Sequence, residues 1–160
     1  MQVAAITVLI CLDRLFKALV EARLKGRGTV VLLRGVLGLT YAENTGAAFS
    51  MFSNSTAALT VVAGIALFAG LLALALVRKK ELIYDICIPL IIAGGAGNQI
   101  DRVTRGYVID YIRTLFIDFP VFNFADCLIT CSCFAIAIWL VYEIVRDSKK
   151  EKEARGGSPA

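Results

Sequence analysis

Residues 125–145 read ADCLITCSCFAIAIWLVYEIV, an apolar run long enough to cross a bilayer, for which a helix needs roughly 20 residues. The chain has 160 residues, of which 58% are hydrophobic, and its mean hydropathy is +0.74. That composition is too apolar for a soluble domain of this length. Similar windows occur at about 2–22, 56–77 and 82–100. The sequence therefore predicts an all-α membrane protein, a bundle of four transmembrane helices that forms one domain over residues 1–146.

Charged residues beside these windows predict the orientation of the chain. Arg78, Lys79 and Lys80 crowd the shortest connection, and further Lys and Arg residues follow the last window. Because cytoplasmic flanks are enriched in Lys and Arg, both regions, and with them both termini, are predicted to be cytoplasmic. Residues 147–160 alternate in charge and end in Gly-Gly-Ser-Pro-Ala, which predicts a disordered cytoplasmic tail.

The two outward connections, about 28–55 and 103–122, are unlike the helical windows. Residues 29–33 and 37–42 are β-prone runs separated by glycine. We therefore expect a small extracytoplasmic β-rich cap on the helix bundle. Residues 47–52 are apolar enough to rest on the membrane surface or to cover a site.

The first window carries charged residues near its end. Central Asp, Arg or Lys residues cost about 2.5 to 3.5 kcal/mol each in a membrane helix. Asp13, Arg14 and Lys17 must therefore be sheltered by other helices. Asp13 and Lys17 are four residues apart, so they share a helix face and can pair with each other or with polar groups elsewhere in the bundle. The window has no basic leader and no small-residue cleavage site, so we expect it to be retained.

Two carboxylates, Asp110 and Asp126, border the hydrocarbon region. Ionisable groups at that depth are costly and usually face a cavity, a partner or a substrate. Asp126 also admits a structural interpretation, because it follows Asn123 by three residues, as in a helix capping box. Spacing alone leaves both interpretations open. Asn98 shares a helix face with Asp101 and Arg102. Helix packing and a helix end cap explain these three polar residues as well as a functional site does.

Composition argues against several other chemistries. The chain has no histidine and no Cys-x-x-Cys motif, and its five cysteines all lie inside apolar windows, where thiols act as small buried hydrophobes. A zinc or haem site would lack its usual ligands, so we expect no metal and no cofactor. The net charge of +4 suits anionic membrane lipid. Since basic and aromatic residues do not interleave, we expect no nucleic-acid partner.

Four motifs, in order along nearly the whole chain, resemble those of the lipoprotein signal peptidases, also called signal peptidase II. They are Asn44-Thr45-Gly46-Ala47-Ala48-Phe49, Gly94-Gly95-Ala96-Gly97-Asn98-Gln99-Ile100-Asp101-Arg102, Val108-Ile109-Asp110-Tyr111 and Phe122-Asn123-Phe124-Ala125-Asp126. The resemblance implies an intramembrane aspartic endopeptidase of the bacterial cytoplasmic membrane. Such an enzyme removes the signal peptide from a prolipoprotein, cutting before a cysteine that carries a diacylglyceryl group.

The resemblance also implies roles for individual residues. Asp110 and Asp126 match the catalytic dyad, which would lie near the outer face of the membrane. Seven further residues match positions that line or support the site: Asn44, Gly46, Asn98, Asp101, Arg102, Asn123 and Ala125. Asp13 and Lys17 match a further family pattern near the end of the first helix. The expected partners are the prolipoprotein and membrane lipid, with the enzyme acting as a monomer.

The chain departs from the usual family pattern at four positions. In the first-helix motif, Arg14 stands where the family usually has Gln, and Phe16 where it has Thr or Ser. Tyr111 stands where the first dyad motif has Phe, and Cys127 where the second has Ser. Two other functions fit the membrane-embedded charges. A small proton-coupled transporter would spread polar residues through the depth of the bilayer. A noncatalytic scaffold would use the acids only as caps and inter-helix contacts.

Overall fold

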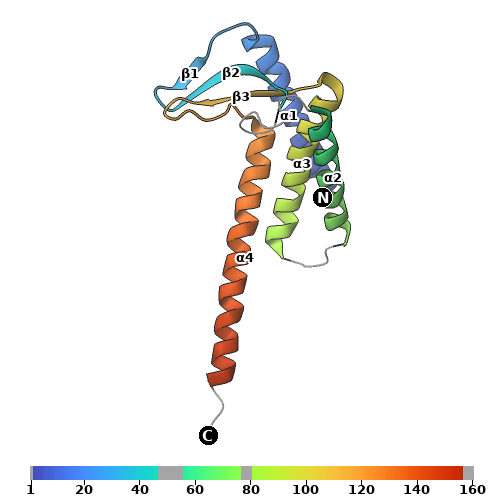
Figure 1. Cartoon of the computed structure of the whole chain (residues 1–160), viewed down its shortest axis with the longest axis vertical. Coiled ribbons are helices and arrows are strands. Elements are labelled where there is room, and N and C mark those ends of the chain that lie inside the picture. The colour runs from blue at the N-terminus through green and yellow to red at the C-terminus, as the bar shows by residue number, and fades with distance from the viewer. Residues whose placement is uncertain (1, 47–55, 77–80, 157–160) are drawn as a thin grey trace.

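The computed structural model describes residues 2–46, 56–76 and 81–156. Its elements in chain order are α1 (Gln2–Leu24), β1 (Val30–Leu33), β2 (Leu37–Asn44), α2 (Thr56–Leu76), α3 (Leu82–Arg105), β3 (Val108–Thr114) and α4 (Phe124–Gly156). The three strands lie together at one end of the helices, and α4 extends well beyond the others at the opposite end (Figure 1). The described residues thus form a mainly helical protein with a small sheet, as the sequence predicts.

The sheet is antiparallel, with strand order β1-β2-β3. Gly35 has a φ of 73° in the connection between β1 and β2, a left-handed conformation that glycine adopts without strain. In the pairing of β2 with β3, Ala42 lies opposite Asp110, and Asn44 lies opposite Val108. This register brings the side chains of Asn44 and Asp110 to the same end of the sheet.

Helix α3 packs against each of the other three helices. Two glycines on α3 permit close approach. A Cβ atom at Gly97 would lie 2.5 Å from Asp13 Oδ2 of α1, and one at Gly94 would lie 2.5 Å from the Ala125 carbonyl oxygen of α4. Small residues of this kind let membrane helices pack with their backbones in contact. The first turn of α4 and the charged part of α1 therefore both lie directly against α3.

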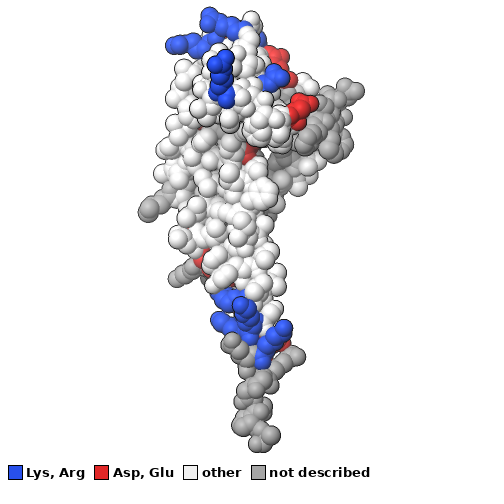
Figure 2. Space-filling view, turned by 90° about the vertical axis from the view of Figure 1, so that its left-hand side faces the viewer, with Lys and Arg blue, Asp and Glu red and all other residues white. Residues whose placement is uncertain are grey.

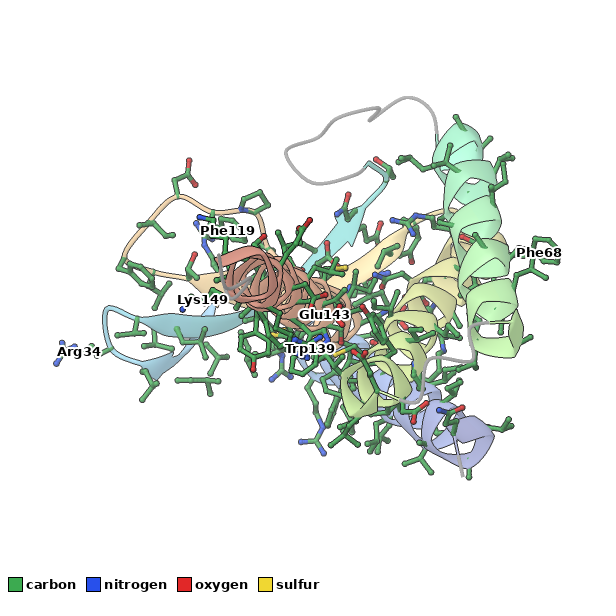
Figure 3. The ribbon with its side chains drawn as sticks, turned by 90° about the horizontal axis from the view of Figure 1, so that it is seen from below. Arg34, Phe68, Phe119, Trp139, Glu143 and Lys149 are labelled. Atoms are coloured by element: carbon green, nitrogen blue, oxygen red, sulfur yellow. The ribbon has the colours of Figure 1, made fainter. Side chains whose placement is uncertain are left out.

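The outer surface of the helices is apolar. Large hydrophobic side chains on α2 and α4 are exposed; Phe68 and Phe134 are 63% and 65% accessible. Phe68 points away from the other helices (Figure 3). In the space-filling view Lys and Arg gather toward the two ends of the molecule, with a long surface between them that carries only small acidic areas (Figure 2). An exposed apolar surface of this extent marks contact with lipid or another protein.

Within the described residues, two helices are long and apolar enough to span a membrane, Leu82–Arg105 and Phe124–Lys152. The apolar stretch Ala57–Leu72 of α2 is shorter. Helix α1 has 23 residues and buries Asp13 and Lys17 against its neighbours. The prediction that the charges of the first window are sheltered is confirmed for Asp13 and Lys17, whereas the Arg14 side chain is 31% exposed.

The structure corrects two predicted boundaries. Helix α4 continues to Gly156, so a disordered tail beginning at residue 147 is wrong for residues 147–156. This segment is rich in Lys, Glu, Ala and Arg, which favour helix, and extending an existing helix requires no new nucleation. Helix α3 likewise runs through Arg105, into the predicted cap, and ends at Gly106, whose φ is 79°. Residues 47–52 and 78–80, to which we assigned a covering segment and a basic connection, lie outside the described residues.

Candidate active site

The two candidate catalytic acids come from different elements and are joined by one asparagine. Asp110 lies in β3, and Asp126 lies in the first turn of α4. Asn123 Nδ2 donates to Asp110 Oδ1 at 2.6 Å, while the Asn123 backbone N–H donates to Asp126 Oδ2 at 3.0 Å. Asn123 is fully buried. A single residue therefore fixes both carboxylates relative to each other.

Each acid has one further amide donor. Asn44 Nδ2 donates to Asp110 Oδ2 at 2.8 Å, and Asn98 Nδ2 donates to Asp126 Oδ1 at 2.7 Å. Asn44 is itself held by the Gly46 N–H, which donates to Asn44 Oδ1 at 2.9 Å. Every carboxylate oxygen of the pair thus accepts an N–H group, which fixes the orientation of both side chains.

The capping interpretation of Asp126 is also correct. The Asp126 N–H donates to Asn123 Oδ1 at 3.0 Å, reciprocal to the Asn123 N–H bond to Asp126. This is the capping box expected from the spacing. Asn123 and Asp126 therefore form the helix cap and also take part in the arrangement that holds the two acids together. The capping interpretation and the site interpretation do not exclude each other.

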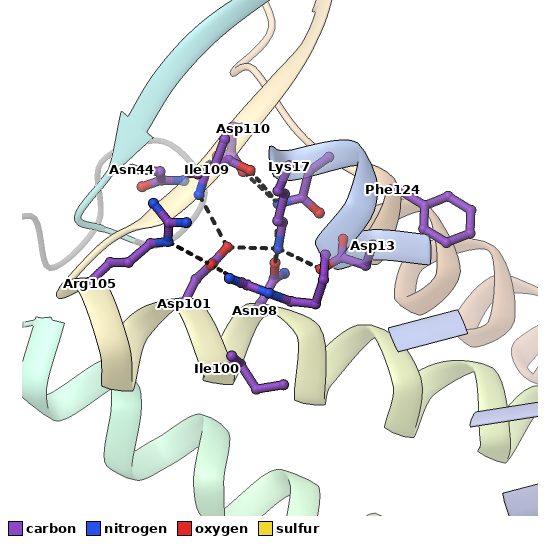
Figure 4. A network of polar contacts seen from close by, with 12 residues as sticks. Asp13, Lys17, Asn44, Asn98, Ile100, Asp101, Arg105, Ile109, Asp110 and Phe124 are labelled. Atoms are coloured by element: carbon purple, nitrogen blue, oxygen red, sulfur yellow. Dashed lines mark hydrogen bonds and ion pairs between the residues drawn. The ribbon is translucent and has the colours of Figure 1, made fainter. Parts of the chain in front are cut away.

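A buried charge cluster lies beneath the acids (Figure 4). Lys17 Nζ contacts Asp13 Oδ2 at 2.9 Å, Asp101 Oδ2 at 3.0 Å and Asn98 Oδ1 at 2.9 Å. Asp101 Oδ2 also accepts from the Ile109 N–H at 3.5 Å. Asp13, Lys17 and Asp101 are all at most 1% exposed. Buried charges are tolerated when they are paired in this manner.

The sequence did not predict three residues in or beside this cluster as site residues: Arg14, Arg105 and Glu21. Arg14 forms an ion pair with Asp101. Arg105 contacts Asp101 at 3.5 Å and Glu21 Oε2 at 2.8 Å. The i,i+4 spacing of Asp101 and Arg105 was a signal for their contact. The contacts of α1 with α3 join residues more than 80 positions apart, and no local pattern indicates them.

A cavity of about 440 Å³ opens onto the acids. Its polar lining comprises Asn44, Gly46, Asn98, Arg102, Asp110 and Asp126. The rest of its lining is mainly apolar and is formed by Val108, residues 119–122, Cys127, Thr130 and Cys131. Apolar pockets with a few converging polar groups are the usual form of a substrate site.

The electrostatic environment distinguishes Asp110. Burial, together with the nearby Asp126 carboxylate, raises the pKa of Asp110 from 3.8 to about 7, against the opposing effect of the hydrogen bonds from Asn44 and Asn123. Two neighbouring carboxyl groups in a poorly solvated site cannot both ionise at low cost. Asp110 is thus suited to carry a proton near neutral pH.

Within the part of the chain that the structure describes, no group of three or more His, Cys, Asp or Glu side chains is arranged to hold a metal ion.

Comparison with known proteins shows the family of this chain. The sequence profile of the signal peptidase (SPase) II family matches residues 5–142. The chain belongs to the signal peptidase II family. A lipoprotein signal peptidase of Streptococcus thermophilus is 40% identical over 126 residues, covering 79% of this chain and 82% of that protein. One from Clostridium acetobutylicum is 34% identical over 154 residues, covering 94% and 98%. A signal peptidase is a protease, so the chain is an enzyme.

Solved structures support the family assignment at the level of the fold. A bacterial membrane enzyme solved at 2.3 Å superimposes with a TM-score of 0.79 at 25% identity, covering 99% of this chain and 92% of that chain. A second, solved at 1.9 Å, has a TM-score of 0.78 at 28% identity and covers 87% and 91%. The similarity spans the sheet as well as the helices.

The structure accounts for two departures from the usual signal peptidase II pattern. Arg14 forms the ion pair with Asp101 described above. The Tyr111 hydroxyl accepts a hydrogen bond from the Phe124 N–H at 3.3 Å and so connects β3 to the start of α4. Cys127, another departure, lines the cavity beside Asp126.

The predicted site residues fall into two groups in space. Asn44, Gly46, Asn98 and Arg102 line the cavity with the two acids. Those that support it from outside are Asp13, Lys17, Asp101, Asn123 and Ala125, all of them buried. Ala125 is fully buried at the contact of α4 with Gly94.

Proposed function

We propose that this chain is an aspartic endopeptidase that removes the signal peptide from diacylglyceryl-modified prolipoproteins, cutting before the lipid-modified cysteine. The observation that carries the proposal is the pair Asp110 and Asp126, held by Asn123 in one cavity. In the absence of histidine, such a pair is the site's available general base and acid.

The surroundings of the two acids assign them different roles. Asp126 accepts two N–H groups at the N-terminus of α4, where a negative charge is favoured. Asp126 therefore takes a proton from the attacking water. Asp110, protonated at rest, donates to the scissile carbonyl oxygen, so that no oxyanion is left uncompensated. The two exchange protonation states as the tetrahedral intermediate collapses and the peptide bond breaks.

We propose a membrane placement that fits this reaction. All four helices of the domain, residues 1–146, span the bilayer, with both termini in the cytoplasm and the sheet on the outer side. Basic residues after the apolar part of α4 support that orientation. The acids, which lie at the sheet end, would then face the outer leaflet, where the lipid-modified cysteine of a precursor is located. Acyl chains could remain in the bilayer while the peptide enters the cavity.

The distribution of buried polar residues favours a protease over a transporter. Among the described residues, the buried charged and amide side chains, Asp13, Lys17, Asn98, Asp101, Asp110 and Asn123, belong to one connected network. A proton relay would instead place such groups at successive depths. Their concentration beneath one cavity is the arrangement that a hydrolytic site requires.

The proposed function is tested with purified protein in detergent and a prolipoprotein precursor prepared with and without the diacylglyceryl group. Mass spectrometry of the products identifies the cleavage position. We expect one cut, immediately before the modified cysteine, and little cutting of the unmodified precursor. If neither precursor is cut, the protease assignment fails; equal cutting of both contradicts the proposed role of the lipid.

The raised pKa of Asp110 predicts the pH dependence of cleavage. Because Asp110 must be protonated to donate, activity should be high below its pKa and should fall as the pH rises through about 7. The measurement is the pH profile of kcat for the diacylglyceryl precursor, taken between pH 5 and 9 with folding monitored at each pH. A kcat that keeps rising up to pH 9 would contradict the assignment of Asp110 as the acid.

A further inference from the structure

The fully buried Lys17 ammonium group contacts three different side chains. Lys17 Nζ donates to Asn98 Oδ1 at 2.9 Å and forms ion pairs with Asp13 Oδ2 at 2.9 Å and with Asp101 Oδ2 at 3.0 Å. These contacts supply the buried cation with two neutralising carboxylates and one hydrogen-bond acceptor. Lys17 does not touch the cavity, yet two of its partners contact groups that position the candidate dyad (Figure 4).

The first connection passes through the amide of Asn98. Asn98 Oδ1 accepts from Lys17 and from Asn123 Nδ2 at 3.1 Å, while Asn98 Nδ2 donates to Asp126 at 2.7 Å. Rotating the amide by 180° would turn its NH₂ group toward an ammonium and its oxygen toward a carboxylate. Both contacts would then be repulsive, so the cation at position 17 permits one orientation of Asn98.

The second connection passes through Asp101. Its Oδ2 contacts Lys17 and accepts from the Ile109 N–H at 3.5 Å. Ile109 is fully buried and immediately precedes Asp110 in β3. The carboxylate that neutralises Lys17 therefore also fixes the backbone beside the second acid.

We propose that Lys17 is a positioning residue for the dyad, orienting Asp126 through the Asn98 amide and the start of β3 through Asp101. This inference rests on the proposed function. It assigns Lys17 more than packing, since a neutral side chain of similar size would fill the space but would remove one of the two donors to Asn98 Oδ1 that fix the orientation of the amide.

The test uses charge-balanced variants, because removing Lys17 alone would leave the buried Asp13 carboxylate without its ion-pair partner. Asp13→Asn combined with Lys17→Met removes one charge of each sign, and Asp13→Asn alone is its reference. Asp13→Asn combined with Lys17→Gln is the conservative version, since its amide retains an N–H donor for Asn98. Arg105→Gln is the matched control, as it removes an ion pair with Asp101 but has no contact with Asn98.

The readouts are kcat and KM for the diacylglyceryl precursor, normalised to folded protein by Trp139 fluorescence. Relative to Asp13→Asn, we expect the Met variant to lower kcat at least about tenfold with KM changed less than twofold. The Gln variant should recover part of the loss. In an Asn98→Leu background, the change from Lys17 to Met should cost less kcat than in the presence of Asn98, because the connection to Asp126 is already broken and only the one through Asp101 remains.

The pH profile supplies a readout that loss of stability would not change. The charged groups around Asp110 are Asp126 and Lys17, with Arg102 on the cavity wall. Since Lys17 lowers the pKa of Asp110, its loss should move the alkaline limb of kcat to higher pH. Arg105→Gln should lower the melting temperature and leave that limb in place.

Three outcomes would overturn the inference: a folded Met variant with the kcat of its Asp13→Asn reference, losses from Lys17 and Asn98 that multiply in full, or an unshifted alkaline limb. If wild-type protein cleaves the precursor and these results follow, the role of Lys17 fails while the proposed function stands. If the wild-type protein does not cleave, the proposed function itself has failed.

Discussion

Asp110→Asn and Asp126→Asn are each expected to lower the rate of precursor cleavage by at least about 10²- to 10⁴-fold, the usual contribution of a positioned acid or base. Asparagine is close in size to aspartate but can neither take the proton from water nor supply one to the carbonyl oxygen. The measurement is single-turnover cleavage of the diacylglyceryl precursor, followed by mass spectrometry. Loss of activity at one position only would mean that the two acids do not form a catalytic pair.

The stability of Asp110→Asn separates catalysis from a scaffold role. Because the pKa of Asp110 is raised from 3.8 to about 7, this group stabilises the fold fully below pH 3.8 and loses that contribution as the pH rises to about 7. Above pH 7 the wild-type protein carries a buried charge that the variant lacks. The melting temperature of Asp110→Asn relative to wild type should therefore increase from pH 5 to pH 8. An inactive variant that is also destabilised equally at both pH values would favour the scaffold interpretation.

Asn123→Ala should have the other large effect, on both activity and stability. The change removes the donor to Asp110 Oδ1 and the acceptor for the Asp126 N–H, and it deletes the side-chain bond to Asn98. Loss of an N-cap side chain costs about 0.5 to 2 kcal/mol. We expect at least about a 100-fold loss of kcat together with a lower melting temperature, measured by Trp139 fluorescence.

Asn123→Ser distinguishes the two functions of this residue. Serine can cap α4 through its hydroxyl but cannot reach Asp110 as the asparagine amide does. The melting temperature should recover toward wild type while kcat remains low. Recovery of both would mean that Asn123 acts only through the helix cap. Asn44→Ala, which removes the other donor to Asp110 and no cap, is the matched comparison.

Much of the architecture is evident from sequence patterns. The apolar windows predict the four helices, and the β-prone runs around Gly35 predict β1 and β2, because these signals are local. The capping box at Asn123 and Asp126 is predicted for the same reason. The helical continuation of α4 beyond residue 147 was missed, since its alternating charges are typical both of a solvated helix and of a disordered tail.

The internal organisation of the site is less accessible to sequence reasoning. Spacing brings Asp13 and Lys17 to one helix face, but the contact of Lys17 with Asn98 depends on the close approach of α1 to α3 at Gly97. The same approach creates the ion pair of Arg14 with Asp101. The pairing of Asp110 with Asp126 is implied only by the family resemblance. No local pattern indicates it, because one acid lies in a strand and the other at the start of a helix. Only the folded chain brings Asn123 between them.

The measurement that most directly tests the catalytic pair is the single-turnover rate of the double variant Asp110→Asn/Asp126→Asn, compared with each single variant on the diacylglyceryl precursor. If the two carboxylates act as one unit on one water molecule, the double variant should cleave about as slowly as either single variant, since removing one member already disables the pair. Losses that multiply in the double variant would show that the two acids act independently, and the proposed dyad would be wrong.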